Sequence, residues 1–184
     1  NEAGLAYYDK MIDAMIENDI VPVITLSHFE MPLHLVKKYG GFRNRQVIDF
    51  FLKFADTVML RYGDRVKYWM TFNEINNQTS WMDPHPMLQN SGLLDYQADE
   101  AQELMYQASH YELLASALVT KRAHEIAREM GCELLVGDMI AMNPVYPASS
   151  NPEDILMAER AMQSRYFWGD VHATGQYPNW LKKF

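Results

Sequence analysis

The sequence contains very little cysteine and few basic residues. Its one cysteine, Cys132, excludes an internal disulfide framework and is typical of proteins that stay in a reducing cytoplasm. Lys and Arg number 16 against 24 Asp and Glu, which gives a formal net charge of -8. Surfaces that bind nucleic-acid phosphates are normally basic, so we expect no nucleic-acid partner. These two shortages predict a cytoplasmic protein that acts on something other than nucleic acid.

Long apolar runs and cofactor motifs are also missing. No stretch approaches the roughly 20 apolar residues that a membrane-spanning helix needs. Residues 1–4 have neither the basic head nor the apolar core of a signal peptide. The six histidines form no HExxH pattern, and neither a GxGxxG nor a Walker motif occurs. We therefore expect no membrane segment, no metal and no other cofactor.

The sequence that is present alternates between helical and strand patterns. Its 48% hydrophobic and 22% charged content is typical of one globular domain. Apolar residues at helical spacing predict helices over 4–18, 33–39, 43–62 and 98–130, and from 151 to about 167. A nearly continuous apolar run predicts a strand buried on both faces over 20–26, and further apolar runs predict buried strands over 66–72 and within 133–142. The polar stretch 76–97 is predicted to be a long loop.

Strands that alternate with helices indicate an α/β fold in which the strands pair in parallel through crossovers. Three strands are too few to close a barrel, which needs eight strands and about 250 residues. The chain begins on a helix before its first strand and stops as a new element starts. We expect it to be the middle of a larger domain.

An amide and a carboxylate, Asn73 and Glu74, stand where the predicted strand 66–72 runs out. In α/β proteins the carboxyl ends of parallel strands are where catalytic groups are usually placed. A charge at the rim of an apolar interior is also expensive. A solvated loop start is the plain alternative for such a pair, so the case for a site depends on the other motifs of the chain.

Three motifs carry a family resemblance. They are Thr25–Pro32 (TLSHFEMP), Trp69–Gln78 (WMTFNEINNQ) and Pro144–Pro147 (PVYP), and they occur in this order along the chain. Together they resemble glycoside hydrolase family 1, whose members are (β/α)8 TIM barrels that hydrolyse β-glycosides with retention. Ile75, where many members have Pro, and the segments 76–78, 108–112 and 139–142 resemble the 6-phospho-β-glucosidase branch.

The resemblance implies that residues 1–184 are the central segment of a single (β/α)8 domain, incomplete at both ends. They would supply its third, fourth and fifth strands. Glu74 would be the general acid/base, which protonates the departing glycosidic oxygen and later activates water. Asn73 would hold the sugar 2-hydroxyl and His28 a glycone hydroxyl. Apart from the resemblance, Trp81 in the predicted loop is a candidate for the aglycone site, because aromatic side chains stack on sugar rings; a tryptophan that is simply packed is the equal alternative.

The second carboxylate of a retaining glycosidase is missing from the recognised pattern. The nucleophile should lie about 5 to 5.5 Å from the acid/base. In the family it belongs to a Glu-Asn-Gly motif, and this tripeptide does not occur here. We therefore expect the nucleophile outside this chain, as we do the residues that recognise the phosphate. Glu30 and Asp138 are the alternative candidates for the nucleophile. For Glu30 we favour a structural role, and for Asp138 we favour an acid inside its strand that is satisfied by hydrogen bonds.

Three functions are consistent with these residues. The favoured one is hydrolysis of 6-phospho-β-glucosides, such as phosphorylated cellobiose, in carbohydrate catabolism. The second is the same chemistry on a 6-phospho-β-galactoside or an unphosphorylated β-glucoside. The third is a catalytically inert piece that binds sugar or serves as an assembly unit. Because open strand edges are templates for pairing, we also expect the chain to self-associate.

Overall fold

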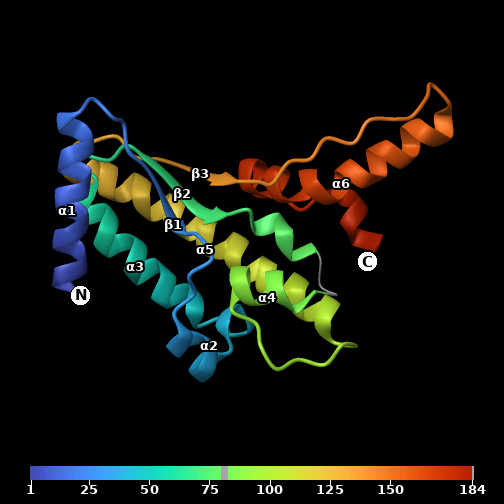
Figure 1. The fold of residues 1–184 in the computed structure, drawn as a ribbon, viewed down its shortest axis with the longest axis horizontal. Coiled ribbons are helices and arrows are strands. Elements are labelled where there is room, and N and C mark those ends of the chain that lie inside the picture. The colour runs from blue at the N-terminus through green and yellow to red at the C-terminus, as the bar shows by residue number, and fades with distance from the viewer. Residues whose placement is uncertain (80–82, 184) are drawn as a thin grey trace.

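The computed structural model describes residues 1–79 and 83–183. Its helices and strands follow one another in the order shown in Figure 1. The strands are β1 (Val23–Ser27), β2 (Tyr68–Asn73) and β3 (Leu135–Met139). The α-helices are α1 (Glu2–Glu17), α2 (Leu33–Tyr39), α3 (Val47–Tyr62), α4 (Pro84–Ser91), α5 (Ala101–Met130) and α6 (Pro152–Thr174). Three short 3-10 helices complete the chain: η1 (Gly41–Arg43), η2 (Ile75–Thr79) and η3 (Asn179–Lys183).

The three strands form one parallel sheet in the order β1-β2-β3. Parallel neighbours require crossover connections, and α3 and α5 are the long helices of these crossovers. The two helices pack against each other beside the sheet (Figure 1). The central strand β2 is therefore paired on both edges, whereas β1 and β3 each have one edge without a strand partner among the described residues.

The sheet has one covered face and one open face. Val23, Tyr68 and Leu135 pair in one row across the three strands and are 56%, 38% and 44% exposed. In the next row Trp69, which pairs with Ile24 and Val136, is 1% exposed. The prediction that the strand of residues 20–26 is buried on both faces is therefore wrong, because the crossover helices cover only one side of the sheet.

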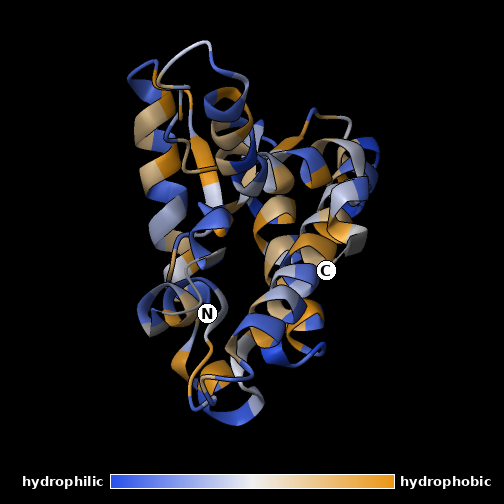
Figure 2. Cartoon of the chain, turned by 90° about the vertical axis from the view of Figure 1, so that its right-hand side faces the viewer, coloured by the Kyte–Doolittle hydropathy of each residue, from blue (hydrophilic) through white to orange (hydrophobic). Residues whose placement is uncertain are grey.

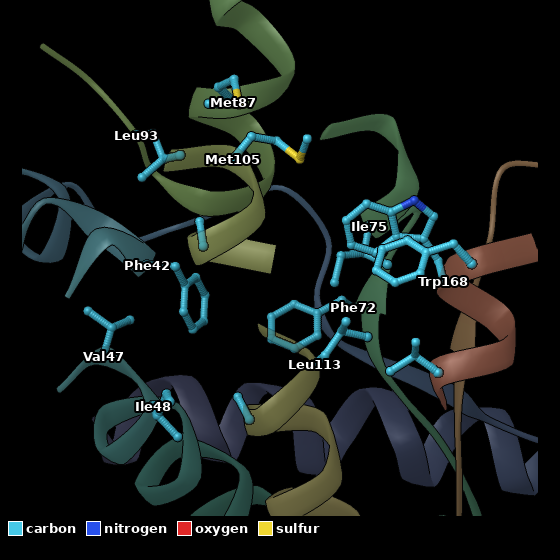
Figure 3. Packing of buried hydrophobic residues seen from close by; sticks show 14 residues of the cluster. Phe42, Val47, Ile48, Phe72, Ile75, Met87, Leu93, Met105, Leu113 and Trp168 are labelled. Carbon is cyan, nitrogen blue, oxygen red and sulfur yellow. The ribbon is translucent and has the colours of Figure 1, made fainter. Parts of the chain in front are cut away.

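The buried side chains form two clusters. The sheet core lies between the sheet and helices α1, α3 and α5, and includes Ile12, Met59, Trp69 and Ile126. The loop core gathers residues from the segments that follow the strands, and Figure 3 shows it at close range. It includes Phe42, Phe72, Ile75, Met87, Met105 and Trp168. Figure 2 shows that the helices carry both hydrophobic and hydrophilic residues along their length, as expected for helices with one buried face.

The predicted long loop 76–97 is wrong, because this stretch contains η2 and α4. The Asp83 side chain accepts a hydrogen bond from the His85 backbone N–H and so caps α4, with Pro84 in the first turn. Gly92 ends the helix with a φ of 67°, which a residue without a side chain adopts readily. The N-terminal Asp-Pro pair and the C-terminal glycine are both visible in the sequence, but they lie within a polar stretch that has no apolar periodicity.

Helix α6 runs to Thr174, further than the predicted end near 167. Its second half packs on the loop core through Phe167, Trp168 and Val171. Its first half projects away from the sheet (Figure 1), and Met157 there is 70% exposed. Within the described residues, none of the helices combines the length and the hydropathy that a membrane span requires.

Candidate active site

Glu74 occupies a sharp turn directly after the central strand. Its φ of 46° lies in the left-handed region, which is uncommon for a residue other than glycine. Its backbone N–H donates to the Met139 carbonyl oxygen at 2.9 Å, which ties the turn to the end of β3. Its carbonyl oxygen accepts from the Asn77 backbone N–H at 2.9 Å and from Asn90 Nδ2 at 3.0 Å. The backbone of Glu74 is thus held by three separate elements.

The carboxylate of Glu74 has a neutral hydrogen-bond donor beside it. Asn77 Nδ2 donates to Glu74 Oε2 at 2.9 Å, and the Glu74 side chain remains partly exposed. The helix η2 that carries Asn77 is fixed to the segment after β3, because Asn76 donates to the Ala141 carbonyl at 2.8 Å and accepts from the Ala141 N–H at 2.9 Å. The carboxylate is therefore oriented and still open to solvent on one side.

Asn73 is the last residue of β2 and is 5% exposed. Its Oδ1 is buried, and within residues 1–79 and 83–183 it has no hydrogen-bond donor, as is also true of Asn90 Oδ1. Both side chains line a small cavity of about 10 Å³, which also borders Glu112. The structure thus places Asn73 next to Glu74 in the chain but mostly beneath the surface of the site.

His28 and Glu30 lie in the turn after β1, the neighbour of β2. His28 is exposed, and its backbone N–H donates to Glu30 Oε1 at 2.8 Å. Because Ser27 pairs with Phe72, the ends of β1 and β2 lie side by side. His28 and Glu74 therefore leave the same edge of the sheet. The Glu30 carboxylate makes a local turn contact, which is the structural role favoured for it from the sequence.

Asp138 does not point toward the open face of the sheet. It shares a face of β3 with Val136, which packs on the sheet core, and its Oδ2 lies 3.2 Å from His172 Nδ1 on α6. The same imidazole nitrogen is 3.0 Å from the Trp168 carbonyl oxygen. Burial raises the pKa of the Asp138 carboxyl, and the nearby His172 opposes this shift. The hydrogen bonds expected for this acid are not found at Asp138 Oδ2, which has no hydrogen-bond partner among the described residues and only the ion-pair contact with His172.

The remaining expectations concern Trp81 and metals. Trp81 lies outside the described residues, so its place in an aglycone site stays a prediction. Across residues 1–79 and 83–183, no group of three His, Cys, Asp or Glu side chains is arranged to hold a metal ion.

Several residues of the site were not singled out from the sequence. Besides Asn77 and Asn90, they are Gln78, Ser91 and Glu112, which form a buried polar cluster behind Glu74. One signal for Glu112 was available. It falls at helical spacing from Ala108, Ser109 and Ser116, all of which are buried on α5, so an acid was to be expected on a covered face.

Comparisons with known proteins agree on one family. The model of glycosyl hydrolase family 1 matches residues 1–184. The chain is 51% identical to the aryl-phospho-β-D-glucosidase BglA of Bacillus subtilis and 44% identical to the phospho-cellobiase of Klebsiella oxytoca, in each case over 100% of its length. It covers 38% and 37% of these two proteins, so it spans under two fifths of the curated relatives.

A solved structure supports the same assignment. The family 1 β-glucosidase from Thermotoga maritima matches 100% of this chain and 39% of its own length, with a TM-score of 0.79 and 26% sequence identity. The fold class expected from the sequence is therefore confirmed: three parallel strands with their helices, as in part of a TIM barrel.

Proposed function

Because this chain belongs to glycosyl hydrolase family 1, we propose that it is the central segment, the third to fifth strands, of a retaining β-glycosidase in which Glu74 is the general acid/base. The observation that carries the proposal is the position of Glu74. It lies at the carboxyl end of the central strand, with its backbone held at three points and its carboxylate oriented by Asn77. Oriented carboxyl groups at such strand ends perform catalysis in barrel enzymes.

The proposed reaction requires Glu74 in two protonation states. As an acid it gives a proton to the glycosidic oxygen while a second carboxylate attacks the sugar, and as a base it then takes a proton from water. We place that nucleophile outside this chain, since the sequence has no Glu-Asn-Gly. Asn73 and His28 are proposed to contact sugar hydroxyls.

The proposed substrates are 6-phospho-β-glucosides, such as phosphorylated cellobiose. The support is that an aryl-phospho-β-D-glucosidase and a phospho-cellobiase are 51% and 44% identical to the chain. A cytoplasmic location is part of the proposal, supported by the single cysteine in 184 residues. Galacto-configured and unphosphorylated glycosides remain the alternative substrates.

A segment exchange tests the proposal. The chain replaces the matching segment of the B. subtilis aryl-phospho-β-D-glucosidase, which supplies the remaining strands, and hydrolysis of a chromogenic 6-phospho-β-glucoside is measured. We expect turnover that falls by about 10²- to 10⁴-fold in the Glu74→Gln variant, the range expected for loss of a general acid/base. Equal turnover by both versions would refute the role of Glu74.

The inert alternative is tested with the same protein. An exchanged enzyme that folds, as judged by circular dichroism, but has no turnover would favour a segment that only binds or assembles. The 184-residue chain by itself should match its own Glu74→Gln variant at background rate. Glu74-dependent turnover by the isolated chain would show that it contains a nucleophile of its own.

A further inference from the structure

Three polar side chains from three helices meet in the interior behind Glu74. Gln78 comes from η2, Ser91 from α4 and Glu112 from α5, and each is 0% exposed. Gln78 Nε2 donates to Glu112 Oε2, and Ser91 Oγ lies 2.8 Å from Glu112 Oε1. Ser91 Oγ is also within hydrogen-bond distance of Gln78 Oε1. The three side chains thus form a closed ring of three contacts, which we call the buried ring.

The number of hydrogens in the buried ring determines the state of Glu112. Three contacts between nitrogen or oxygen atoms need three hydrogens. The Gln78 amide supplies one, at the contact of its nitrogen, and the Ser91 hydroxyl supplies one. Exchanging the Gln78 nitrogen and oxygen leaves this count unchanged. An ionised carboxylate supplies none, so one contact would join two oxygen atoms with no hydrogen between them.

We propose that Glu112 is a protonated, neutral carboxylic acid that closes the buried ring and acts as a positioning residue for Glu74. Its hydroxyl donates to Ser91, Ser91 donates to Gln78, and Gln78 donates back to Glu112. Every ring atom then has a partner, as buried polar groups require. The part of this proposal that concerns catalysis rests on the acid/base role proposed for Glu74.

The buried ring reaches Glu74 through two adjacent residues. Asn77, which precedes Gln78, donates to the Glu74 carboxylate at 2.9 Å. Asn90, which precedes Ser91, donates to the Glu74 carbonyl oxygen at 3.0 Å. The ring therefore fixes η2 and α4, the two elements whose side chains orient Glu74. If the ring opened, both donors would be free to move.

The environment of Glu112 is consistent with a neutral acid. Burial raises the pKa of its carboxyl to about 8, although the hydrogen bonds from Ser91 and Gln78 act in the opposite direction. No charged group of the described residues contributes to this shift. The titratable side chains of the elements around the ring are engaged elsewhere or face solvent; they include Glu74, Arg43 in η1, and Asp83 and His85 at the start of α4.

The protonation of Glu112 is tested on the 184-residue chain, independently of any activity. Isotope-edited infrared spectra, with glutamate carboxyl groups labelled, are recorded at neutral pH for the chain and its Glu112→Gln variant. We expect a protonated-carboxyl band that is lost in Glu112→Gln and kept in Glu103→Gln, an exposed control on the same helix. Identical spectra for the chain and Glu112→Gln would overturn the proposal.

The positioning role is tested in the exchanged enzyme described above. Gln keeps a neutral group of the same shape, so Glu112→Gln should retain kcat within about threefold, whereas Glu112→Ala should lower kcat by about ten- to hundredfold with a smaller change in KM. An equal loss in both variants would overturn the positioning role, and so would no loss in either. If Glu112→Ala fails to fold, a kcat for Glu112→Gln that falls beyond threefold is sufficient to overturn it. If Glu74→Gln is fully active, the proposed acid/base role of Glu74 is refuted. The infrared test of Glu112 protonation does not depend on that role and remains valid.

Discussion

The two ends of the sheet use different kinds of polar cluster to join helices. At the carboxyl ends of the strands, the buried ring connects η2, α4 and α5 without exposure to water. At the amino ends, α1 is joined to α3 and the turn after it by ion pairs. Asp9 accepts from Arg61 Nη2 at 2.6 Å and from Arg65 Nη2 at 2.7 Å. We call this second group the surface ion network.

Solvent access accounts for the difference between them. The charges of the surface ion network remain in contact with water, so they keep their hydration and contribute little net stability. A charge in the buried ring would lose its hydration with no counter-ion to replace it, and the site therefore holds a proton instead. The dry cluster constrains geometry more tightly, because each of its groups is costly to leave unpaired.

The largest effect should be a difference in pH dependence. Glu112 has a pKa of about 8 in the folded chain against an ordinary value of 4.5. Between these values the folded state holds a proton that the unfolded chain has released, so the free energy of unfolding falls as the pH rises. The slope is at most about 1.4 kcal/mol per pH unit.

Urea unfolding of the chain and of Glu112→Gln across this pH range measures the effect. Other groups with a shifted pKa, such as Asp138, are common to both and cancel in the difference. We expect Glu112→Gln to gain stability relative to the parent chain as the pH rises toward 8, and the difference to level off above it. Parallel curves would mean that Glu112 does not titrate with a raised pKa.

A smaller effect is expected from removing one hydroxyl of the buried ring. Ser91→Ala deletes one donor and one acceptor and leaves Gln78 and Glu112 each short of a partner. We expect a loss of about 1 to 3 kcal/mol in the free energy of unfolding. The matched control is Ser164→Ala on the exposed face of α6, which should change stability by no more than about 0.5 kcal/mol. Similar values for the two variants would show that the ring is not closed in solution.

The smallest effect is expected in the surface ion network. Asp9→Asn should destabilise the chain slightly at neutral pH and low salt, and the loss should diminish at high salt. Hydrogen bonds from Arg61 and then Arg65 lower the pKa of Asp9 from 3.8 to about 2. Its contribution is therefore present above 3.8 and is lost as the pH falls through 2, the opposite direction to Glu112. An Asp9→Asn effect that persists at high salt would contradict this comparison.

The sequence was sufficient for the three strands, for the α-helices other than α4, and for the place of Glu74 at a strand end, because these depend on local patterns. Apolar periodicity predicts α2 and α5 to within a few residues, and the position of Glu74 follows from where an apolar run stops. The buried ring could not be predicted in this way. Its members are separated by 13, 21 and 34 residues along the chain, and only the packing of α4 on η2 and α5 brings them together.

The exposure of the strands was mispredicted for a related reason. The apolar run that ends in β1 has the pattern of a strand covered on both faces, yet Val23 is 56% exposed. An apolar run shows that a strand is suited to burial on both faces. Whether that environment is present depends on neighbouring strands and helices, and within the described residues the open face has none.

The left-handed backbone conformation of Glu74 lowers the stability of the folded chain at the position proposed for the acid/base. Glycine adopts a φ of 46° without steric conflict, whereas a glutamate there brings its Cβ close to the following carbonyl oxygen, at a cost of roughly 1 kcal/mol. Glu74→Gly should therefore raise the melting temperature of the chain while removing the carboxylate. At the proposed acid/base position the most stabilising residue would thus be an inactive one, and such a loss of stability in favour of reactivity is expected of catalytic residues.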